Sequence, residues 1–65
     1  MNPEQKYQIR QLLEVPQMNA AQMITLLSVW LDAERDPEVV NMICVALNVA
    51  REIDKSLSVA LEGKI

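Results

Sequence analysis

The sequence predicts an all-α fold, a three-helix unit with two short helices packed on a long C-terminal helix, which assembles as a helical-bundle homodimer. Three observations predict this class. The 65 residues include one glycine, Gly63, and few other turn residues, whereas a sheet needs several turns. The prolines Pro3, Pro16 and Pro37 lie where helices would begin or break. The chain is 51% hydrophobic, and its apolar residues recur at helical spacing. We treat residues 1–65 as a single domain.

The first helix is predicted over residues 3–14. Asn2 suits the N-cap, and Pro3 suits the first helical position because its missing N–H would be unpaired there. The helix should end before Pro16, because the residue that precedes a proline avoids the helical conformation. Its apolar residues form one narrow stripe, so this helix can cover a core but cannot be its centre.

The second helix is predicted over residues 20–34. Asn19 suits the N-cap, and Gln22 three residues later forms a variant of the capping box. Trp30 lies at the edge of the apolar face, where it is either the one large filler of the core or an anchor of an interface. Both roles are open at this point. The main apolar face consists of Ala20, Met23, Ile24, Leu27 and Leu31.

The third helix is predicted over residues 37–62. Asp36 is the expected N-cap, Pro37 follows at the first helical position, and Gly63 is the expected stop. At 1.5 Å per residue this helix is roughly 39 Å long, longer than either of the other two. The helix is therefore expected to bend, to fray, or to extend beyond its own hairpin.

The third helix carries an apolar row with the alternating spacing of a coiled-coil seam. The row consists of Val39, Ile43, Ala46, Ala50, Ile53, Leu57 and Ala60. Flanking apolar residues widen the arc beyond the ~100° that a surface helix needs, so we expect a further helix, from a second copy or from another protein, to cover it. The residues predicted to form this interface are Trp30, Val39, Ile43, Ala46, Leu47, Ala50, Ile53 and Leu57.

Charge and residue types narrow the possible functions. The formal net charge is -3, which argues against polyanion binding, and the chain has no His to act as a base near neutral pH. We therefore expect no catalytic residues, no cofactor and no metal. The leading hypothesis is a non-enzymatic protein–protein interaction module, a small regulator or adaptor of the inhibitor, anti-activator or co-chaperone type, which binds itself and a partner protein. The alternative is a small dimeric transcriptional modulator whose Arg51 and Lys55, doubled by symmetry, contact DNA.

Two further features have simple structural explanations. Cys44 falls within the most apolar stretch, so we expect a buried, unreactive thiol. Acidic residues at positions 32, 34, 36 and 38 surround the second turn, but a calcium loop would need a glycine at its sixth position. We expect this turn to be solvated or to dock a basic partner.

The expected location is the cytoplasm, and we expect no membrane binding. Residues 1–10 lack the basic and apolar regions of a secretory signal, and no apolar run approaches the ~18 residues of a membrane span. A single thiol is also typical of a reducing compartment.

Overall fold

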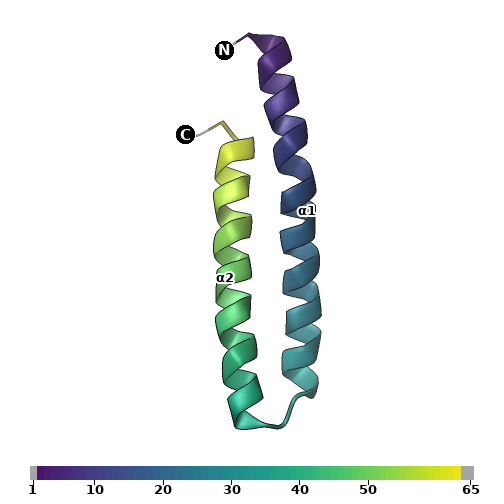
Figure 1. The fold of residues 1–65 in the computed structure, drawn as a ribbon, viewed down its shortest axis with the longest axis vertical. Helices are drawn as coiled ribbons and strands as arrows, with labels where there is room; N and C mark the ends of the chain where they lie inside the picture. The colour runs from purple at the N-terminus through teal and green to yellow at the C-terminus, as the bar shows by residue number, and fades with distance from the viewer. Residues whose placement is uncertain (1, 64–65) are drawn as a thin grey trace.

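The computed structural model describes residues 2–63 and folds them into an antiparallel helical hairpin (Figure 1). Helix α1 spans Pro3–Ala33 and helix α2 spans Pro37–Leu61, with residues 34–36 forming the turn between them. The hairpin measures 51 × 17 × 11 Å. The all-α class is confirmed, but the described residues contain two helices and not the predicted three.

The prediction was wrong at Pro16, where the first helix was expected to end. Helix α1 continues through Pro16, and Asn19 lies inside the helix instead of capping a new one. An interior proline removes one backbone hydrogen bond and crowds the carbonyl of the residue four positions earlier, at a cost of about 3 kcal/mol. A continuous α1 runs beside α2 (Figure 1), and contacts between the helices on both sides of Pro16 offset the local cost: the core near the turn, and the hydrogen bond from Arg10 to Leu61 at the open end.

The predicted starts of the first and last helices and the final stop are confirmed. Asn2 Oδ1 accepts a hydrogen bond from the backbone N–H of Gln5 at 2.8 Å, and Gln5 Oε1 accepts one from the N–H of Asn2 at 3.4 Å. Asp36 Oδ1 accepts from the N–H of Glu38 at 2.9 Å and caps α2. Gly63 has a φ of 72°, a left-handed conformation that glycine adopts without strain and that stops the helix. Helix α2 ends at Leu61, one residue before the predicted end.

The core is a single strip between the two helices. Leu27, Ile43, Leu47 and Ala50 form its buried centre, and Ile43 is only 2% exposed. The half-buried residues that pack against this centre are Ile24, Leu31 and Val39.

The seam on α2 is rotated relative to the predicted row. Leu47 is buried, whereas Ala46 and Ile53 of the predicted row are exposed. The predicted row and the inward residues share Val39, Ile43, Ala50 and Leu57, so spacing alone could not distinguish them. The residues of α2 that turn inward are Val39, Val40, Ile43, Leu47, Ala50, Asp54, Leu57 and Leu61.

The length of α2 is matched by its neighbour. In the described residues α2 is one continuous helix, and α1 runs beside it and projects past its C-terminal end (Figure 1). The predicted shortage of covering helix therefore arose from dividing α1 in two. Neither helix within residues 2–63 is long and apolar enough to span a membrane.

Candidate functional site

Most of the large apolar side chains lie on the surface of the hairpin. The described residues include five buried hydrophobic residues and no buried polar residue, whereas thirteen large hydrophobic residues are between 43% and 74% exposed. Scattered exposed apolar residues are normal, but a contiguous group of them marks an interaction surface. Their positions around the two helices therefore determine whether they form one interaction surface.

On α1 the exposed apolar side chains follow a row beside the core. Successive residues turn by about 100° around a helix, so Leu12, Met23, Leu26 and Trp30 lie on average about 100° to one side of the core residues Ala20, Ile24, Leu27 and Leu31. Their exposed fractions are 74%, 48%, 61% and 47%. Leu12 and Met23 belong to the same row only because α1 continues through Pro16.

On α2 a second row stands in the same relation to the core. Met42, Ala46, Val49 and Ile53 lie on average about 100° from the line of Ile43, Leu47 and Ala50, in the same rotational sense as on α1. All four are exposed.

The two rows form one surface. Viewed from one end of the hairpin, antiparallel helices turn in opposite senses, and their core-facing directions also oppose each other. Rows displaced in the same sense from their cores therefore lie on the same side of the hairpin. We call this surface the apolar face, and it consists of Leu12, Met23, Leu26, Trp30, Met42, Ala46, Val49 and Ile53.

The opposite side of the hairpin carries several of the charged residues, although the exposed Tyr7 and Met18 also point there. The same helical geometry places Arg10, Glu14 and Asp32 of α1 there, together with Arg51 and Lys55 of α2. The last two, which the DNA-binding alternative invoked, are exposed and about one turn apart. None of these charged residues lies within the two rows of the apolar face, so the hairpin is amphipathic as a whole.

Cys44 lies on this polar side, and the expectation of a buried thiol was wrong. The thiol is free and exposed. With Ile43 pointing into the core, its neighbour Cys44 is turned about 100° away. The apolar residues that precede and follow Cys44 in the sequence therefore do not cover it.

The structure divides the predicted interface residues into two groups. Within this single chain, the first group lies in or beside the core between the helices: Val39, Ile43, Leu47, Ala50 and Leu57. The second group is exposed on the apolar face: Trp30, Ala46 and Ile53. Sequence reasoning missed the remaining members of the face, although an unbroken helical wheel from residue 3 to residue 33 would have aligned those on α1.

Trp30 stands at the end of the apolar face nearest the turn. Its ring is 47% exposed, so it is not the large filler of the core within this chain. Its indole Nε1 donates a hydrogen bond to Glu34 Oε2 at 3.3 Å. This bond orients the indole, and a tryptophan with an apolar ring and one satisfied polar group is well suited to anchor an interface.

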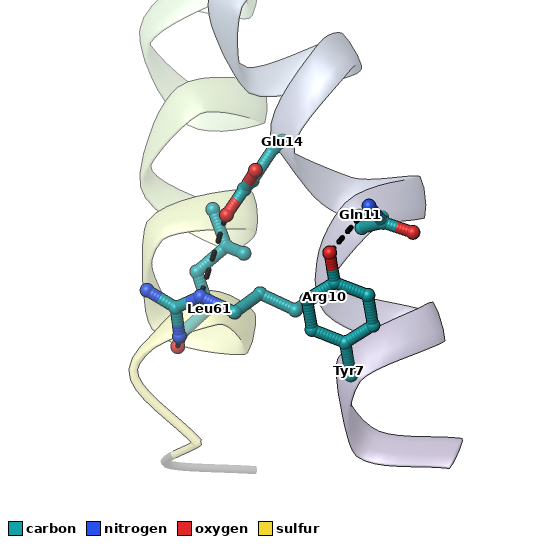
Figure 2. Close-up of polar contacts among 5 residues, drawn as sticks. All are labelled: Tyr7, Arg10, Gln11, Glu14 and Leu61. Carbon is teal, nitrogen blue, oxygen red and sulfur yellow. Dashed lines mark hydrogen bonds and ion pairs between the residues drawn. The ribbon is translucent and has the colours of Figure 1, made fainter. Parts of the chain in front are cut away.

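Polar contacts lie at the open end of the hairpin, both within α1 and between α1 and α2 (Figure 2). Arg10 Nη1 donates to the backbone carbonyl of Leu61 at 2.9 Å, and Arg10 Nε lies 3.3 Å from Glu14 Oε1. Gln11 Nε2 donates to the Tyr7 hydroxyl at 3.0 Å. The Arg10 contact joins the last turn of α2 to α1, where a cation is also favoured by the dipole of α2.

An open groove of about 670 Å³ lies at this end, where α1 projects beyond α2. The groove is open to solvent, so it does not enclose a ligand as a small-molecule site does. Its lining comes from Pro3, Lys6, Tyr7, Ile9, Arg10, Leu13, Ala60, Leu61 and Gly63.

The acidic turn has structural partners for two of its carboxylates. Asp36 caps α2, and Glu34 accepts the hydrogen bond from Trp30. No group of three or more His, Cys, Asp or Glu residues in the described part of the chain is arranged to hold a metal ion.

Fold and site together define the class: an antiparallel two-helix hairpin with one apolar and one polar side. The chain matches no known family model, no curated protein and no solved structure.

Proposed function

We propose that this chain is a non-enzymatic protein–protein interaction module of the cytoplasm, a small regulator or adaptor of the inhibitor, anti-activator or co-chaperone type. The apolar face binds a second copy of the chain and a partner protein. One observation carries the proposal: seven of the thirteen large exposed hydrophobic side chains lie together on the apolar face, and the charged residues lie outside its two rows. Amphipathic helices bind proteins in this way, by laying an apolar face against a complementary helix or groove.

The small core supports the same proposal. With five buried residues, all of them hydrophobic, the hairpin encloses little apolar volume among residues 2–63. Chains below about 70 residues without disulfides or metals need either exceptional packing or oligomerisation to be stable. Covering the apolar face would supply the missing burial.

The experiment is sedimentation equilibrium on the wild-type chain and two matched variants. Ile53→Asp places a charge on the apolar face, whereas Asn48→Asp places the same charge on the polar side of the same helix. Because an unpaired charge is costly to bury, Ile53→Asp should convert an associated chain at micromolar concentration into monomers. Asn48→Asp should leave the associated state unchanged. A wild-type chain that is monomeric and unfolds cooperatively would refute the self-association, and equal masses for the two variants would exclude the apolar face as the surface that mediates it.

A further inference from the structure

We infer that a second copy of this chain covers the apolar face in a two-fold symmetric four-helix bundle, with the turns of the two hairpins at opposite ends. This inference rests on the proposed function and adds to it the arrangement of the two copies. Four observations carry it: the surface area of the single chain, the angle between its two apolar rows, the charge of the apolar face and the position of the net charge.

The exposed area is the first observation. The accessible surface of the hairpin is 5195 Å², whereas a compact monomer of 7.4 kDa exposes about 4,200 Å² by the usual scaling with mass. The excess of about 1,000 Å² is close to the ~800 Å² that each partner buries in an interface of standard size. The radius of gyration of 15.1 Å likewise exceeds the ~11 Å expected for a compact domain of this length.

The angle between the two apolar rows is the second observation. On each helix the core row and the row of the apolar face lie about 100° apart. Four helices at the corners of a square each contact two neighbours whose directions differ by about 90°. Within one chain, each helix covers the core row of the other. A second hairpin packed on the apolar face would cover the remaining row of both helices at once.

The absence of charge in the two rows of the apolar face is the third observation, and it favours a copy of the chain over a highly charged partner. Across a two-fold axis the same patch faces itself, so a charge on it would be buried against an apolar residue or, near the axis, against its own like charge. The eight residues of the apolar face are aliphatic, methionine and tryptophan side chains, and Asn19, which the same helical geometry places within the α1 row, is polar but uncharged. Such a surface can pair with itself without leaving a buried charge unpaired.

The position of the net charge is the fourth observation, and it selects the orientation. Residues 32–38 hold four acidic residues and one basic residue, a net charge of -3; the remaining five acidic and five basic residues sum to zero. The whole net charge of the chain therefore lies at the turn. A bundle with both turns at one end would place two such clusters side by side.

Opposite turns separate these clusters. The middle of the apolar face lies near residue 22, about 13 residues from the turn, so a two-fold axis there holds the two turns about 40 Å apart at 1.5 Å per residue. This distance is several times the ~8 Å over which physiological salt screens charges. Each acidic turn then lies alongside the open end of its partner, where Lys6 lines the groove.

Distances between spin labels test the arrangement. Gln8 and Gln22 are both exposed, uncharged and 14 residues apart on α1, so they point in similar directions. Each is replaced by cysteine in a Cys44→Ser background, which removes the exposed native thiol. Pulsed dipolar spectroscopy then measures the separation between the two copies for each single-label variant, after circular dichroism has verified that both variants keep the helix content of the parent.

Opposite turns predict that the two positions give different distances. Label 22 lies near the two-fold axis, so its axial separation is close to zero, whereas label 8 acquires an axial separation of about 42 Å, twice 14 residues at 1.5 Å each. The measured distance should therefore be at least 15 Å longer at position 8. With both turns at one end, the distance between the two copies would be nearly constant along α1.

Each outcome bears on a distinct claim. Equal distances at the two positions would overturn the opposite-turn arrangement while leaving self-association through the apolar face intact. If dipolar coupling is absent and sedimentation also shows monomers, both the second copy and the proposed self-association fail. If the chain associates but Ile53→Asp does not dissociate it, the apolar face is not the contact surface, and this inference fails with it.

Discussion

Pro16 lies inside α1, and replacing it with alanine should stabilise the protein. Its ring removes the N–H that would donate to the carbonyl of Leu12 and crowds that carbonyl. Proline is about 3 kcal/mol less favourable than alanine in a helix interior. Because Pro16 is exposed, the substitution removes little packing, and we expect Pro16→Ala to raise the free energy of unfolding by about 2 to 3 kcal/mol per chain.

Urea unfolding followed by far-ultraviolet circular dichroism measures this change. All variants are compared at one protein concentration, because self-association would make the apparent stability depend on concentration. Pro37→Ala is the matched control. Pro37 occupies the first position of α2, where its missing N–H has no helical partner, so its replacement should give no gain and a loss of up to about 1 kcal/mol.

A helix broken at Pro16 predicts the opposite sign. If residues 15–19 formed a loop, the proline would restrict the unfolded chain without straining the folded one. Pro16→Ala would then be neutral or destabilising by about 0.4 to 1 kcal/mol, as expected for Pro37→Ala. A stability change of that sign would refute the continuous α1, and with it the alignment of Leu12 with the other members of the apolar face.

Three other expectations follow from the hairpin. Ile43→Ala should lower the free energy of unfolding by about 2 to 5 kcal/mol, because this side chain is only 2% exposed, and an undiminished urea midpoint would contradict its place in the core. Asp36→Ala removes the cap of α2 and should lower stability by about 1 kcal/mol in the same assay, whereas an unchanged midpoint would show that the cap bond contributes nothing. Cys44 should react with a disulfide reagent nearly as fast in the native protein as in denaturant, and a hundredfold slower native reaction would contradict its exposure.

The helix ends that the sequence predicted correctly depend on local signals. Asn2 and Asp36 cap the N–H groups within the next three residues, and Gly63 adopts its left-handed conformation without help from distant residues. Each contact lies within one turn of the residue that makes it. Such features can be read from a few neighbouring letters of the sequence.

The boundary at Pro16 was mispredicted because the local signal opposed a non-local one. Proline disfavours the interior of a helix, and Asn19 followed by Gln22 resembles a new helix start. The competing term is the packing of a 31-residue α1 along α2, which involves residues far apart in the chain. One example is Gln17 Nε2, which donates to Ser58 Oγ at 2.9 Å. No window of neighbouring residues contains that contribution.

The spacing of apolar residues likewise could not predict which side of α2 faces α1, and this rotation bears on the proposed interface. Of the two overlapping rows on α2, one is entirely apolar and includes Ala46 and Ile53, whereas the other includes Asp54. The hairpin turns the row with Asp54 inward, where that residue is half-buried, and leaves Ala46 and Ile53 exposed. A helix stabilised only by its own hairpin would gain more by burying the wholly apolar row, since a half-buried carboxylate loses hydration. The observed rotation is consistent with a chain in which α1 covers one row and a second copy covers the other.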